Sequence, residues 1–89
     1  MSGITININA KECYDVQIAM QELNSDKEIV SVARVAERVE INQYRVRYIV
    51  DYLVKNGYVV KVPYKISGAY KRYFMRIEKF INPDEDIVQ

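Results

Sequence analysis

Polar and basic side chains crowd the first two turns of a helix expected over about residues 42–56. They are Asn42, Gln43, Tyr44, Arg45, Arg47 and Tyr48. An arginine can pair bidentately with guanine and a glutamine with adenine, while a tyrosine can donate to a phosphate or pack on a thymine methyl group. A solvated helix face, in which Arg47 pairs with Asp51 four residues further on, accounts for the same residues without any ligand.

A second basic group flanks a turn near the C-terminus. Residues 58–66 and 70–80 are rich in β-branched and aromatic residues and meet at Ser67-Gly68-Ala69, so they predict a β-hairpin. The basic residues beside this turn are Lys61, Lys65, Lys71 and Arg72. Such side chains can neutralise phosphates without reading sequence. A charged edge that discourages strand-to-strand aggregation is the alternative interpretation.

The distribution of charge favours a polyanionic partner. Residues 42–79 hold nine basic and two acidic residues, a net charge of +7, whereas residues 1–41 and 80–89 each carry −3 and the whole chain +1. A basic segment of this kind is the electrostatic pattern expected of a nucleic-acid-binding domain. An unevenly charged, solvated surface would show the same pattern.

Catalysis and metal binding find little support in the sequence. The chain has no histidine and a single cysteine, Cys13, which lies on an apolar helical stripe. There is no glycine-rich phosphate loop and no Cys/His spacing typical of zinc. We therefore expect no enzyme activity, cofactor, metal or small-molecule effector. No apolar run reaches the roughly 18–20 residues of a membrane span, and a lone cysteine fits a reducing, cytoplasmic setting.

The elements that must position these residues are three helices. Asn9 is placed to cap a helix over about 10–24, with Glu12 completing a capping box. Ser31 can cap a second helix and Asn42 a third, which Gly57 ends. The expected inward-facing residues are Cys13, Val16, Met20 and Leu23 in the first helix, Val32, Val35, Ala36 and Val39 in the second, and Val46, Ile49, Val50 and Leu53 in the third. A short strand is expected at Ile29-Val30, and a strand or extended arm over residues 1–9.

The stretch VARVAERVEINQYRVRYIVDYLVKNGYV, residues 32–59, resembles the winged helix-turn-helix domains of bacterial and archaeal regulators. The matching features are an Ala-acidic-x-hydrophobic pattern at 36–39, a hydrophobic residue at 41, a polar quartet at 42–45 and Gly-aromatic-Val at 57–59. AYKRYFMRIEKF, residues 69–80, is similar to the basic, aromatic return strand of such wings. The turn departs from the pattern, because it carries Glu40 where glycine is usual and a left-handed residue is required. The quartet is bulky rather than rich in Ser and Thr.

The resemblance implies an α+β fold, a winged helix-turn-helix with a three-helix core and a C-terminal β-hairpin wing. Its parts would be an arm at 1–9, the winged domain at 10–80 and a short acidic tail at 81–89. It implies a sequence-specific double-stranded DNA-binding protein, a small transcriptional regulator that acts as a homodimer. The recognition helix, about 42–56, would enter the major groove, and the wing, about 58–78, would lie on the backbone or in the minor groove.

Two alternatives remain open at this stage. A protein-interaction module or a subunit of a larger assembly would use the same fold, with the basic face secondary. A chromatin-like binder would hold DNA through phosphates with little sequence preference. Richness in Tyr, Ile, Val and Lys, without Trp or His, is compatible with an archaeal or viral origin.

Overall fold

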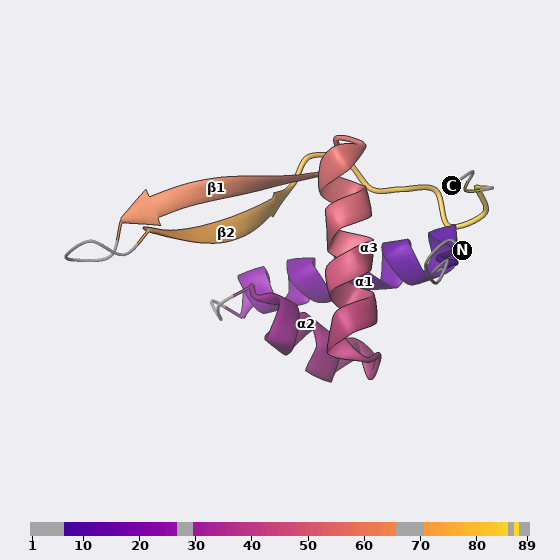
Figure 1. Cartoon of the computed structure of the whole chain (residues 1–89), viewed down its shortest axis with the longest axis horizontal. Helices are drawn as coiled ribbons and strands as arrows, with labels where there is room; N and C mark the ends of the chain where they lie inside the picture. The colour runs from indigo at the N-terminus through magenta and orange to yellow at the C-terminus, as the bar shows by residue number, and fades with distance from the viewer. Residues whose placement is uncertain (1–6, 27–29, 66–70, 86, 88–89) are drawn as a thin grey trace, which may run out of the picture.

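The computed structural model of the chain describes residues 7–26, 30–65, 71–85 and 87, without the side chains of residues 63–65 and 71–74. Its elements are α1 (Ala10–Ser25), α2 (Val32–Val39), α3 (Gln43–Lys55), β1 (Val59–Lys65) and β2 (Lys71–Ile77), as Figure 1 shows. Three helices followed by an antiparallel hairpin confirm the predicted α+β winged-helix layout. None of the described helices has the length and apolarity needed to cross a bilayer.

Local capping explains where the helices begin. The side chains of Asn9, Ser31 and Asn42 accept hydrogen bonds from backbone N–H groups two or three residues further on, at 2.8, 3.2 and 2.8 Å. Each bond satisfies an amide that the first helical turn leaves without a partner. The three predicted N-caps are therefore confirmed.

Left-handed residues end the second and third helices. Glu40 follows α2 with φ 57° and ψ 40°, and Gly57 follows α3 with φ 80°. A left-handed conformation costs glycine little but strains a residue that carries a Cβ atom. The tight turn between α2 and α3 thus holds a glutamate in a conformation that favours glycine, as the sequence predicted.

The core lies where the three helices meet the root of the hairpin. Its buried side chains include Cys13, Val16, Met20 and Leu23 of α1, Val35 and Ala36 of α2, and Val46, Ile49, Val50 and Leu53 of α3. Val32 and Val39 are only partly buried against it. The predicted apolar stripes therefore converge on one core, with two positions at its margin.

The hairpin is a two-stranded antiparallel sheet with a register running from Val59 opposite Ile77 to Lys65 opposite Lys71. β1 lies against α3 and β2 against α1. Met75 and Ile77 pack on the core at the root, and Val59 is buried. Pro63 is tolerated because each strand of a two-stranded sheet has an unpaired edge.

Gln17 of α1 anchors the hairpin at its root. The side chain is fully buried. Its Nε2 donates to the carbonyl oxygens of Lys79, at 2.9 Å, and Tyr58, at 3.4 Å, and its Oε1 accepts from the backbone N–H of Ile81 at 2.8 Å. One amide thus ties α1 to the chain before β1 and to the chain after β2.

Two expectations about the shorter segments need correction. Val30 is buried but belongs to no strand, and Ile29 lies outside the described residues, as do residues 1–6 of the expected arm.

Ile81 is 1% exposed and belongs to the core. Ile87 packs partly against the core, and Glu85 accepts a hydrogen bond from the Tyr58 hydroxyl at 3.4 Å. The packed fold therefore continues past residue 80 instead of ending in an unattached tail.

Candidate nucleic-acid interface

The first two turns of α3 present an exposed polar and aromatic surface. Tyr44 is 82% exposed and Tyr48 41%, and Gln43 and Arg47 are also exposed. Gln43, Tyr44 and Arg47 line a shallow hollow of about 150 Å³. Because the core-facing residues occupy the other side of α3, these four side chains can be reached together by one ligand.

Arg47 is free to contact a ligand. Asp51 stands four residues further along α3, but the described residues show no ion pair between Asp51 and Arg47. Both side chains are exposed. The local ion pair that would have explained Arg47 without a ligand is therefore absent from this part of the chain. Asp51 places a negative charge in the third turn, so a polyanion would be favoured only along the first two turns.

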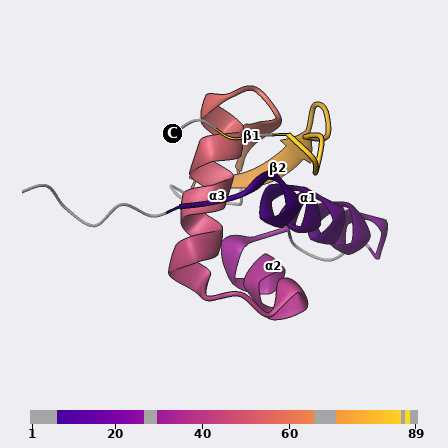
Figure 2. The same ribbon diagram turned by 90° about the vertical axis from the view of Figure 1, so that its right-hand side faces the viewer.

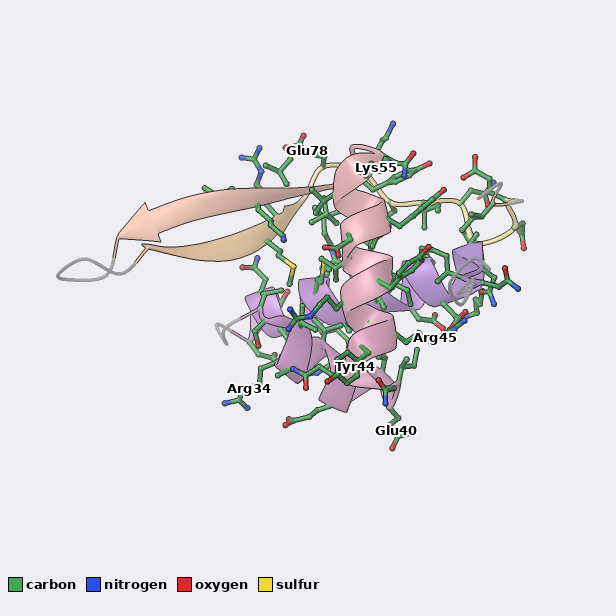
Figure 3. The ribbon with its side chains drawn as sticks, in the orientation of Figure 1. Arg34, Glu40, Tyr44, Arg45, Lys55 and Glu78 are labelled. Carbon is green, nitrogen blue, oxygen red and sulfur yellow. The ribbon has the colours of Figure 1, made fainter. Side chains whose placement is uncertain are left out.

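Arg45 lies in a different environment from the rest of the polar set. Its Nη2 and Nε contact the two carboxylate oxygens of Glu12, each at 2.6 Å, and Nη2 also donates to the carbonyl oxygen of Asn7 at 2.6 Å. Figure 3 shows Arg45 on the flank of α3 that faces away from the hairpin. Arg45 joins α3 to the start of α1 and does not lie with Gln43 and Arg47.

The electrostatics of this pair follow from its geometry. The hydrogen bonds from Arg45 lower the pKa of the Glu12 carboxyl, and the same bonds raise the pKa of Arg45. A bidentate arginine–carboxylate pair is among the stronger polar contacts in proteins. Glu12 was predicted to complete a capping box with Asn9, and its carboxylate also accepts a hydrogen bond from the Asn9 backbone, which lowers its pKa further.

Asn42 serves mainly as a cap. Its side-chain oxygen accepts the N–H of Tyr44 at 2.8 Å, which fixes the first turn of α3. The residue as a whole is exposed. Asn42 therefore sets where the exposed α3 surface begins.

Arg34 is a candidate that the sequence reasoning missed. It lies in the first turn of α2, it is exposed, and it forms no ion pair with the described residues. Figure 3 shows it projecting on the same side of α3 as the hairpin. The cap at Ser31 was the signal, because it places residue 34 at the start of the helix that precedes α3.

The hairpin brings the second basic group together through its register. Lys65 lies opposite Lys71, and Tyr64 lies opposite Arg72. The side chains of these residues lie outside the description, whereas that of Lys61 is described as exposed. Like charges directly opposite one another on a hairpin are unfavourable unless something neutralises them. The backbone register therefore places two basic residues, Lys65 and Lys71, at the same level of the hairpin.

The described residues offer neither a group of metal ligands nor an exposed cysteine. They contain no group of three or more His, Cys, Asp or Glu side chains that could hold a metal ion. Cys13 is buried, and burial raises the pKa of its thiol to about 11, which keeps it neutral and unreactive at ordinary pH.

No protein-family model, curated protein or solved structure matches the chain.

Proposed function

We propose that this chain is a winged helix-turn-helix protein that binds double-stranded DNA in a sequence-specific manner, as a small transcriptional regulator. The observation that carries the proposal is Arg47, which is exposed beside Gln43 and Tyr44 on the first two turns of α3 and forms no ion pair with the described residues. An arginine and a glutamine on one exposed helix end can both make bidentate contacts to base edges. α3 enters the major groove by this end.

The side chains divide into three roles. Gln43, Tyr44 and Arg47 face base edges, and Tyr48 lies at the border between bases and backbone. The phosphate contacts come from Arg34, Lys61, Lys65, Lys71 and Arg72. Arg45 and Asn42 position α3 rather than read sequence, which revises the sequence-based expectation for Arg45. Because α3 and the hairpin divide these tasks, specificity resides in the first and affinity largely in the second.

The protein acts by occupying DNA, without a catalytic step or cofactor, and as a homodimer that reads two half-sites. A protein-interaction module is the second candidate, and one observation favours it: Tyr44 is 82% exposed, and tyrosine is enriched at protein interfaces. The +7 charge of residues 42–79 favours DNA over this alternative.

Binding of a random-sequence duplex, followed by fluorescence anisotropy at several salt concentrations, tests the proposal. We expect Arg47→Ala to weaken binding to a selected site about 5- to 150-fold, equivalent to about 1–3 kcal/mol for one bidentate base contact. Lys55→Ala is the matched control, because Lys55 carries the same charge at the other end of α3 (Figure 3) and should change affinity only slightly.

Three outcomes would contradict the proposal. Absence of binding at low salt, where phosphate attraction is strongest, would remove DNA as the partner. Equal losses for Arg47→Ala and Lys55→Ala would mean that the α3 end contributes charge alone. Failure to enrich any sequence from the random pool would indicate a chromatin-like, non-specific binder.

A further inference from the structure

A groove of about 480 Å³ runs between α1 and the strand and return segment that follow the hairpin turn. Its lining residues from α1 are Met20, Gln21 and Asn24, and those from the other wall are residues 75–80. Met20 is buried in the core, and Met75 and Ile77 are partly buried against it. The floor of the groove is therefore apolar.

Phe80 stands at this groove with much of its ring in solvent. Three large hydrophobic side chains are exposed among the described residues: Tyr44, Tyr48 and Phe80. The two tyrosines lie on α3, in the candidate DNA interface, whereas Phe80 is 41% exposed and packs its ring against that of Tyr14 at a centroid distance of 6.0 Å. The DNA-binding role of α3 thus leaves the exposure of Phe80 unexplained.

We infer that this surface, the α1–β2 face, pairs with the same surface of a second copy of the chain around a two-fold axis. The α1–β2 face comprises the half-buried Tyr14, Ile18, Met75 and Ile77 and the exposed Phe80, which follows β2. A two-fold interface uses one patch twice, so the patch must carry both a projection and a recess. Phe80 supplies the projection and the adjoining groove supplies the recess.

The charges around the groove suit a copy of itself better than DNA. Gln21 and Asn24 are neutral, and Arg76 forms an ion pair with Glu78. Lys79 also lines the groove, and its ammonium lies over the Tyr58 ring at 5.1 Å from the ring centroid, so the rim carries one positive charge that no acidic side chain of the described residues pairs. A rim with a single net positive charge meets itself with little like-charge repulsion, and it attracts phosphates only weakly. The exposed Arg47 of α3 and Lys61 of β1 do not line this groove.

A stable pairing through this face requires surface from α1 beyond the groove. A stable interface buries about 800 Å² on each partner, roughly an eighth of the 6535 Å² that this chain exposes. The groove alone is smaller than this. Tyr14 and Ile18 lie one helical turn apart on α1 and are half-buried, so they extend the apolar surface along the helix beside Phe80.

The position of the α1–β2 face leaves the exposed surface of α3 uncovered. In Figure 2, α3 and α1 lie on opposite sides of the view, and β2 is the strand that contacts α1. Pairing through α1 and β2 therefore keeps both α3 helices exposed. The presentation of two recognition helices to two half-sites rests on the proposed function. The pairing of two chains can be tested without DNA.

Sedimentation velocity of the full chain without DNA tests the inference. Interfaces of standard size have dissociation constants from micromolar to picomolar, so chain concentrations up to about 100 µM should populate the dimer. We expect a species of twice the 10.5 kDa chain mass. Phe80→Glu should raise the dissociation constant at least about tenfold, because it places a charge at the centre of an apolar contact. Tyr44→Glu, the same kind of change on α3, should leave dimerisation unchanged.

A second variant and a direct distance measurement keep the test decisive. Should circular dichroism show that Phe80→Glu is unfolded, Ile18→Glu replaces it, because Ile18 lies outside the buried core. A spin label on Gln21→Cys should give a short intermolecular distance, and buried Cys13 would stay unlabelled. A monomer at the highest concentration, or equal dimerisation of the Phe80→Glu and Tyr44→Glu variants, would overturn the inference. A dimer that binds no DNA would instead refute only the proposed function.

Discussion

Replacing Gln17 with leucine should destabilise the fold more than any other single polar substitution in α1. Leucine has a similar size but can form none of the three hydrogen bonds that Gln17 makes to Tyr58, Lys79 and Ile81. The Tyr58 carbonyl keeps a partner, because it also accepts the N–H of Glu78 at 2.9 Å. The change therefore leaves two backbone groups without partners, the Lys79 carbonyl and the Ile81 N–H.

The magnitude follows from those two groups. A buried polar group left without a partner costs about 1–3 kcal/mol. The Ile81 N–H is buried and should carry the larger cost, while the Lys79 carbonyl is only partly buried. The gain from a more apolar side chain offsets a fraction of this. We expect Gln17→Leu to lower the free energy of unfolding by about 2–4 kcal/mol. This is a large part of the total stability of a domain this size, which is at most roughly 13 kcal/mol.

Urea denaturation followed by circular dichroism measures this loss. Gln43→Leu is the matched control, because it is the same substitution at an exposed position and should change stability by no more than about 0.5 kcal/mol. Hydrogen exchange adds a local readout, since the Ile81 amide should lose protection in Gln17→Leu beyond the global loss. A destabilisation below about 1 kcal/mol, with the Ile81 amide still protected, would refute the view that Gln17 anchors the hairpin root.

Three further predictions concern single residues. Arg45 holds the pKa of Glu12 below its ordinary 4.5, so the pair stabilises the fold above that pH. This contribution is lost as the pH falls through the lowered pKa. Acid unfolding of wild type should therefore be steeper below pH 4.5 than that of Glu12→Gln. Glu40→Gly should raise the free energy of unfolding by about 0.5–1 kcal/mol in urea titrations, because it relieves a left-handed glutamate. Cys13, with a thiol pKa of about 11, should resist a thiol reagent at pH 8 until the chain unfolds.

Each of these predictions has a clear contrary result. Identical acid-unfolding curves for wild type and Glu12→Gln would mean that the Arg45 pair adds no pH-dependent stability. A destabilised Glu40→Gly would mean that the glutamate side chain contributes more than its backbone conformation costs. Rapid modification of Cys13 in the folded protein would show that α1 opens readily.

Local features of the sequence predicted most of the fold. Asn9, Ser31 and Asn42 mark helix starts because a cap acts on amides two or three residues away. The apolar stripes predicted the core because helical periodicity depends only on neighbouring turns. Gly57 and the turn residue Glu40 were identified because a positive φ is a local requirement.

Contacts between distant residues account for what the sequence did not predict. Arg45 looked like a base-reading residue, but its partner Glu12 is 33 positions away. The role of Gln17 depends on Ile81, 64 positions further on, so no local pattern reveals it. Both interactions need knowledge of how the helices pack, which periodicity alone does not supply. Arg47 and Asp51 show the converse, because a spacing suited to an ion pair did not produce one.

The way the hairpin is attached makes it an exchangeable part. Among the described residues, its contacts with the helices lie at the root, where Val59, Met75 and Ile77 pack and Gln17 holds the adjoining chain. A longer, shorter or differently charged distal segment could be grafted between residues 62 and 74 while the helices keep their own core. Attraction for DNA could then be tuned through the graft while the choice of sequence stays with α3.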